Sequence, residues 1–162
     1  MDEREGDLFA PHVAPLMELV RDWRAREHLD VPNVDPNDGG KDARLLVLLE
    51  SPGPRAVGTG FVSRDNPDPS ARNIGRLLDG AGFGRSEVLF WNVVPFCVST
   101  IDRNRNASRS QIVAAVPRTN AFIMRLPHLR VIVLGGRRAQ IVRPLLAVPE
   151  GAVCIETFHP GA

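Results

Sequence analysis

The sequence predicts an α/β protein: a three-layer α/β/α sandwich with a four-stranded parallel sheet. Four short apolar segments, rich in β-branched residues, lie at 44–50, 87–94, 129–134 and 152–157. Helical patterns separate these segments, and strands that alternate with helices imply right-handed crossovers and a parallel sheet covered on both faces. The first segment is apolar from Leu45 to Leu49, as expected of a strand buried on both sides.

A helix and a loop precede the first strand. Apolar residues recur at helical spacing over about 11–28, at Val13, Leu16, Met17, Val20 and Trp23. The segment 31–42 is rich in Pro, Asn, Asp and Gly and is predicted to be a loop. We expect one domain over 1–162, with this helix and loop (1–43) in front of an α/β core (44–162).

Helices are predicted after the first three strands. After the first, we expect Ser70 to cap a helix that Gly82 ends, with Ile74, Leu77, Leu78 and Ala81 as its apolar residues. Residues 108–126 form the second, which Pro117 must kink or divide. Residues 137–147 form the third.

Composition describes an ordinary single domain, with 43% hydrophobic and 24% charged residues and a net charge of +1. No apolar run approaches the ~20 residues that cross a bilayer, and the start lacks a secretory signal, so we expect a cytoplasmic protein without a membrane partner. The two cysteines, Cys97 and Cys154, cannot alone form a disulfide framework, a zinc site or an iron–sulfur site, so we expect no metal or cofactor. The near-neutral charge leaves nucleic-acid binding to local patches.

Polar residues follow the predicted strands at the edge where parallel sheets bind ligands. Glu50 ends the first strand and enters the turn Ser51-Pro52-Gly53-Pro54. Its carboxylate could orient a water or stabilise a developing cation. Alternatively, it caps the next segment or pairs with an arginine.

Asn92 and His159 are the polar residues of two further strand exits. Asn92 interrupts an apolar run, and a pyrimidine edge that offers an N–H and a carbonyl would satisfy a buried amide; a loop backbone is the alternative partner. Pro160 restricts His159 to extended geometry, and a neutral imidazole there could donate to an anionic leaving group. Alternatively, His159 is a surface residue.

Glycine-rich and arginine-rich segments suggest contacts with nucleic acid. The Gly135-Gly136 turn before Arg137 and Arg138 could hold a phosphate, or could serve only to turn the chain. The polar loop with Arg103, Arg105 and Arg109 faces nucleic acid or is simply solvated. Phe61, between Gly60 and Val62, is the candidate to stack on a flipped base; alternatively, it anchors its loop to the core.

Together these motifs resemble the uracil-DNA glycosylase superfamily, in particular members with an E-x-P-G turn after the first strand. The resemblance runs from about residue 44 to the end and depends on the order and spacing of several short motifs. The matching positions are Glu50-Ser51-Pro52-Gly53, Phe61, Trp91-Asn92-Val93-Val94-Pro95-Phe96, Val131-Ile132-Val133-Leu134-Gly135 and His159-Pro160-Gly161.

The resemblance implies a pocket that receives a uracil flipped out of DNA. Glu50 would position the hydrolytic water or support the oxocarbenium-like sugar, and His159 would hydrogen-bond the uracil carbonyl as the base leaves. Phe61 would stack on the base and Asn92 would read its Watson–Crick edge. We place Ser51 and Gly53 in the same base-binding set, and Gly135, Gly136, Arg137 and Arg138 in a phosphate or DNA-binding set.

Three departures from the family pattern shape the expectations. With two cysteines, the chain is not expected to hold the four-cysteine iron–sulfur cluster of one branch. Gly161 stands where serine is common. Relatives continue into a loop and helix that press on the DNA minor groove, and this sequence ends at Ala162. We therefore expect activity on single-stranded DNA more readily than on duplex. Separately, we expect a monomer.

Three hypotheses of function follow. The leading one is a DNA repair glycosylase that hydrolyses the N-glycosidic bond of deoxyuridine. The second is a truncated glycosylase-like module that binds nucleic acid or a base without catalysis. The third is a nucleotide-binding or nucleoside-processing α/β domain that uses the Gly135-Gly136 turn.

Overall fold

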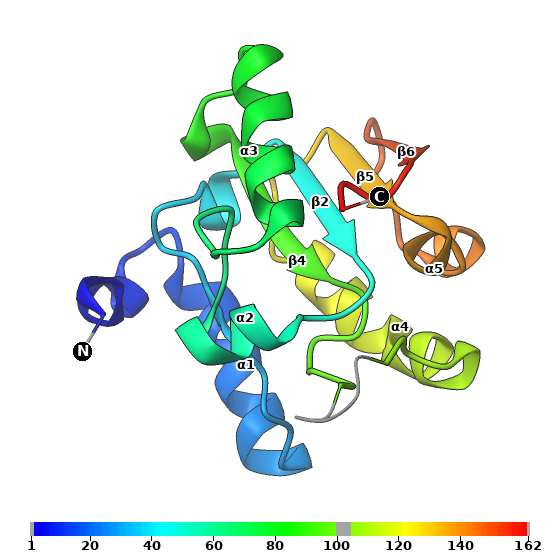
Figure 1. Cartoon of the computed structure of the whole chain (residues 1–162), viewed down its shortest axis with the longest axis horizontal. Helices are drawn as coiled ribbons and strands as arrows, with labels where there is room; N and C mark the ends of the chain where they lie inside the picture. The colour runs from blue at the N-terminus through cyan, green and yellow to red at the C-terminus, as the bar shows by residue number, and fades with distance from the viewer. Residues whose placement is uncertain (1, 100–104, 162) are drawn as a thin grey trace.

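A four-stranded parallel sheet forms the centre of the protein, as described by a computed structural model of residues 2–99 and 105–161. Its strands are β2 (Leu45–Leu49), β4 (Val88–Asn92), β5 (Val131–Gly135) and β6 (Val153–Thr157), in the order β4-β2-β5-β6 (Figure 1). All four lie at the predicted segments, β5 ending one residue later. The predicted fold class is confirmed.

Strand register brings the carboxyl ends to one edge of the sheet. Leu49 of β2 pairs with Asn92 of β4, Leu48 pairs with Leu134 of β5, and Gly135 pairs with Thr157 of β6. The chain adds β4 on one side of β2 and then β5 on the other. This reversal creates the topological switch point, beside the end of β2, where open α/β sheets bind their ligands.

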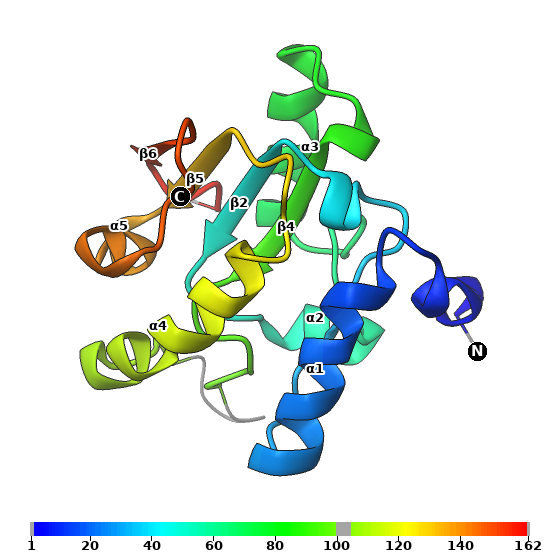
Figure 2. The ribbon, with the colours of Figure 1, turned by 180° about the vertical axis from the view of Figure 1, so that it is seen from behind.

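Helices cover both faces of the sheet, with α2 (Pro54–Thr59) and α3 (Pro69–Gly80) on one face and α1 (Ala14–Glu27) and α4 (Arg109–Ile123) on the other (Figures 1 and 2). The Trp91 ring stacks on Phe122 of α4, with centroids 4.5 Å apart. Since side chains alternate along a strand, Phe90 and Asn92 face the α3 side. None of the described helices is long and apolar enough to cross a membrane.

The predicted helices are present, with changes at Pro-containing ends. Pro117 lies inside α4 without dividing it. The predicted helix over 137–147 consists instead of α5 (Arg137–Gln140) and the 3-10 turn Arg143–Leu145. Further 3-10 turns are Glu3–Phe9, Gly40–Asp42 and Arg85–Glu87.

The N-cap of α3 corrects the sequence prediction. Asp68, not Ser70, caps the helix, and its carboxylate accepts the Ala71 N–H at 2.9 Å. Pro69 is the reason, because proline fits the first helical position and so begins the helix before Ser70. The predicted end at Gly82 is confirmed: its φ is 79°, and its N–H donates to the Asp79 carbonyl at 3.1 Å.

A small parallel ladder joins the N-terminal part to the segment after α2. β1 (Asn33–Val34), inside the predicted loop 31–42, pairs with β3 (Phe61–Val62). Neither these two-residue strands nor α2 was predicted from the sequence. This ladder decides which way the side chains of β3 face.

Candidate active site

A cavity of about 360 Å³ opens at the carboxyl edge of the sheet, beside the N-terminal half of α3. Glu50, Asn92 and His159, the residues of three strand exits, line it together, and so do Ser51 and Gly53. Its volume suits a small organic ligand or one nucleotide base. Three of the four predicted strand exits therefore converge at this cavity.

Asn92 is a buried amide with no hydrogen-bond partner among the residues that the structure describes. It is the last residue of β4, only 4% of its surface is exposed, and it lines the cavity. Within residues 2–99 and 105–161, no hydrogen bond to its side chain is found, so the alternative of a bond to a loop backbone is not observed. Because buried amides normally have partners, its donor and acceptor are suited to a ligand.

Glu50 combines an anchoring contact with a place at the cavity. One carboxylate oxygen accepts the backbone N–H of Ala107, which lies just before α4. Arg138 donates to the Ala107 carbonyl at 2.9 Å. None of the described arginines forms an ion pair with Glu50. The carboxylate thus fixes the loop before α4 while one oxygen remains for chemistry.

His159 lies in a turn that determines its tautomer. Its Nδ1 accepts the Gly161 N–H at 3.1 Å, so a neutral ring carries its proton on Nε2. Asn73 of α3 donates from Nδ2 to the Pro160 carbonyl at 2.7 Å. The turn is therefore tied to the helix that forms one wall of the cavity, and Nε2–H is the available donor.

Glycines at 136 and 161 allow the His159 turn to pack closely, and Gly135 allows β5 to pack against Leu49. A Cβ on Gly136, whose φ is 88°, would lie 3.0 Å from the His159 Cβ. A Cβ on Gly135 would lie 2.6 Å from Leu49, and one on Gly161 would lie 2.4 Å from the Ser70 hydroxyl. Glycine at 161 thus fits the close approach of this turn to α3.

The predicted phosphate-binding set lies beside the cavity but does not line it. The Gly136 N–H donates to the Thr157 carbonyl at 2.9 Å, so it is not free for a phosphate. The Arg137 side chain is exposed, and Arg138 contacts Ala107. This arrangement fits the alternative, in which the two glycines turn and pack the chain.

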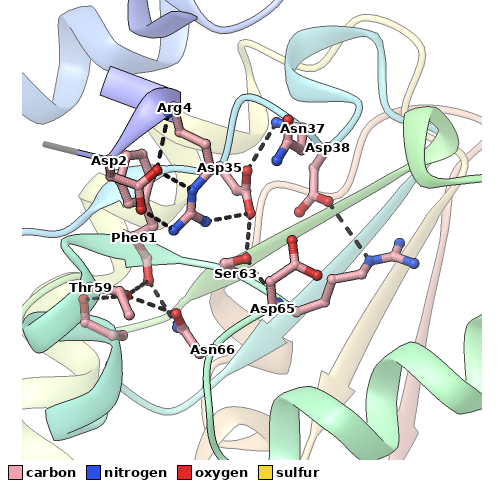
Figure 3. Close-up of polar contacts among 12 residues, drawn as sticks. Asp2, Arg4, Asp35, Asn37, Asp38, Thr59, Phe61, Ser63, Asp65 and Asn66 are labelled. Atoms are coloured by element: carbon pink, nitrogen blue, oxygen red, sulfur yellow. Dashed lines mark hydrogen bonds and ion pairs between the residues drawn. The ribbon is translucent and has the colours of Figure 1, made fainter. Parts of the chain in front are cut away.

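Phe61 lies away from the cavity. Its side chain is 1% exposed, and the Arg4 guanidinium lies 4.1 Å from the ring centroid (Figure 3). Its neighbour Val62 lines the cavity instead, because adjacent residues of β3 face opposite sides. This position does not fit the predicted stacking on a base and fits the alternative of a core anchor.

The arginine-rich loop before α4 reaches the mouth of the cavity. Arg105 and Asn106 are exposed and line it. Arg103 lies outside the described residues. Arg109 begins α4 and is exposed.

A polar wall of the cavity, formed by residues after β3, was not predicted from the sequence. Ser63, Arg64 and Asn66 line the cavity. The run of polar and turn-forming residues from Ser63 to Asp68 is the signal in the sequence that could indicate this wall.

A buried acidic pair supports this wall (Figure 3). The Asp35 carboxylate accepts from Ser63, from Arg4 at 3.1 Å and from Arg85 at 3.0 Å. Asp38 accepts from Arg85 at 3.0 Å. Burial, and then the charge of Asp35, raise the pKa of Asp38 to about 7.

Comparison with known proteins agrees with this geometry. The family description "Uracil DNA glycosylase superfamily" matches residues 36–162, which is 127 of the 162 residues. No curated protein matches the sequence. The matched region contains the whole sheet and every residue of the cavity. The chain belongs to the uracil DNA glycosylase superfamily.

Proposed function

We propose that this protein is a DNA glycosylase that hydrolyses the N-glycosidic bond of uracil flipped out of DNA. One observation carries the proposal: the unpartnered amide of Asn92 shares a cavity with the Glu50 carboxylate and the His159 imidazole. Membership of the superfamily supports glycosylase chemistry, and the three side chains support uracil as the base.

Asn92 would recognise the base. Uracil presents an N3–H donor beside a carbonyl acceptor. The carbonyl of an amide can accept from N3–H, and its NH₂ group can donate to the carbonyl of the base. Cytosine reverses this pattern, with an unprotonated ring nitrogen beside an amino group. The Asn92 amide pairs with uracil when its carbonyl oxygen faces N3–H, and rotation by 180° would pair it with cytosine, so the comparison of uracil with cytosine in the assay below tests its orientation.

His159 and Glu50 would act on the scissile bond between C1′ of the sugar and N1 of the base. As that bond breaks, its electron pair moves to the base, and Nε2–H of His159 donates to the carbonyl on which charge develops. Glu50 would stabilise the cationic sugar and hold the water whose oxygen bonds to C1′. The proton released by that water balances the charge of the departing base.

Two exposed arginines support DNA as the partner. Arg55 at the start of α2 and Arg105 before α4 both line the cavity. Guanidinium groups at the mouth of the cavity suit the phosphates that flank a flipped nucleotide. A free base would not need these charges.

Release of uracil from an oligonucleotide tests the proposal. Single-stranded and duplex oligonucleotides with one deoxyuridine are incubated with excess protein, and abasic sites are detected by alkaline strand cleavage. The same oligonucleotides with cytosine or thymine are the controls. We expect abasic sites with uracil only. Binding without abasic sites, by protein that circular dichroism shows to be folded, would contradict the proposal.

A further inference from the structure

A second hollow, of about 460 Å³, opens between Leu29, Val57 and Phe96. These residues belong to three separate parts of the chain: the segment that follows α1, the helix α2 and the segment that follows β4. Pro54 and Ser99 line both the second hollow and the cavity, so the two spaces adjoin. The base-excision chemistry proposed above does not use the second hollow.

The walls of the second hollow are suited to the face of a flat ring. Leu29 and Phe96 are half-buried: each packs against the hydrophobic core and also lines the second hollow. Val57 is 39% exposed. Nucleic acid bases stack on aromatic side chains with little dependence on sequence, because every base has a π-face. The volume of the second hollow is sufficient for one base.

Polar side chains also line the second hollow, where they could meet the polar edge of a base. His28 and Asp30 line it, and both are exposed. Neither side chain forms a hydrogen bond or an ion pair with any residue in the described part of the chain. An imidazole and a carboxylate can together donate to and accept from the edge of a base. An occupant with an apolar face and a polar edge therefore fits the second hollow better than a wholly apolar one.

The position of the second hollow fits the nucleotide next to the one in the cavity. Consecutive bases of a strand are separated by one sugar–phosphate unit, and the two spaces adjoin at Pro54 and Ser99. Arg55 follows Pro54, lines the cavity and is exposed. It forms no ion pair among the residues that the structure describes, so its guanidinium can contact the phosphate that links the two nucleotides.

We propose that the second hollow binds the base next to the flipped uracil, stacked on Phe96, when the substrate is single-stranded DNA. The inference rests on the proposed function, because the uracil in the cavity defines which base is its neighbour. In duplex DNA the neighbouring base is paired, and drawing it out would require a second base pair to open. Single-stranded DNA has no such pair to open. The second hollow therefore favours single strands as substrate.

Removal of one flanking base from the substrate tests this role. Single-stranded oligonucleotides carry one deoxyuridine and an abasic tetrahydrofuran on its 5′ side, on its 3′ side or on neither side. The protein concentration at which single-turnover uracil release is half-maximal is measured for each. We expect the loss of one neighbour to raise that concentration by at least about fivefold, as loss of base–aromatic stacking should, and the loss of the other to change it by less than about twofold. No change, or equal changes on the two sides, would overturn the proposal.

Phe96→Leu removes the aromatic ring but keeps an apolar side chain against the core. Phe83→Leu is the matched control, because Phe83 is 37% exposed and lines neither space. In proteins that melt at similar temperatures, we expect Phe96→Leu to raise the half-maximal concentration by at least about fivefold and Phe83→Leu by less than about twofold. The abasic neighbour should add nothing further in the Phe96→Leu protein. Equal effects of the two variants, or full additivity of Phe96→Leu and the abasic neighbour, would overturn the proposal.

A fluorescent base separates this proposal from the proposed function. The base 2-aminopurine replaces each neighbour of deoxyuridine in turn, and its fluorescence is followed as protein is added to the single-stranded oligonucleotide. We expect a saturable change on one side, abolished by Phe96→Leu, whether or not uracil is released. Uracil release without this change would overturn the role of the second hollow and leave the glycosylase assignment intact. The change without release would support the second hollow and contradict the glycosylase assignment, and an oligonucleotide that does not bind would overturn both.

Discussion

The hydrogen bond from Asn73 to the Pro160 carbonyl predicts a measurable loss of activity on substitution. Asn73→Ala removes the Nδ2 donor, 2.7 Å from its acceptor, on the exposed surface of α3. A neutral hydrogen bond contributes about 0.5–1.5 kcal/mol net. If that free energy holds the His159 turn in place, the rate of base release falls by about two- to tenfold.

A double-mutant cycle with His159→Ala isolates this effect. Single-turnover uracil release is measured for each single variant and for the double variant, with Leu77→Ala, an exposed substitution on the same helix, as the control. Since Asn73 would act only through His159, it should add nothing once that ring is removed. An equal loss from Asn73→Ala in both backgrounds would refute the reasoning.

Other consequences can be checked separately. Asn92→Asp should lower uracil release by at least about tenfold, roughly 1.4 kcal/mol in barrier, with an unchanged affinity for undamaged DNA as its control. Phe61→Leu should leave the rate of base release by folded protein within about threefold, and a larger loss would restore a stacking role. The raised pKa of Asp38 means that the folded state keeps a proton that the unfolded chain releases near pH 3.8, so this group's stabilisation is complete below that pH and is lost as pH rises through about 7. Asp38→Asn should therefore raise the free energy of unfolding by up to about 4 kcal/mol at pH ~8 but much less at pH ~4, and equal effects in urea titrations at the two pH values would contradict the raised pKa.

Local pattern was sufficient to predict the sheet. The apolar segments that become β2 and β4 are buried along almost their whole length, so their composition reflects the final environment. The helical spacing from Val13 to Trp23 predicted α1 for the same reason. The predicted cap of α3 was wrong because Ser70 and Asp68 are both good capping residues, and only the position of Pro69 distinguishes them.

The site residues that were predicted are those placed by sheet topology, and the others are placed by tertiary contacts. Glu50, Asn92 and His159 were found because parallel topology alone brings strand ends together. The direction in which the Phe61 side chain points depends on the pairing of β3 with Asn33–Val34. This is a contact between distant segments of only two residues each. The places of Arg64 and Asn73 also depend on tertiary contacts, with Phe90 and Pro160, which leave no periodic signal in the sequence.

Direct detection of free uracil tests most directly whether Glu50, Asn92 and His159 form a base-excision site. The protein is incubated in excess with a single-stranded oligonucleotide that contains one deoxyuridine, and the released base is measured by mass spectrometry. We predict one uracil released per oligonucleotide, and none when deoxycytidine replaces deoxyuridine. Folded protein that binds the oligonucleotide and releases no uracil would contradict the account.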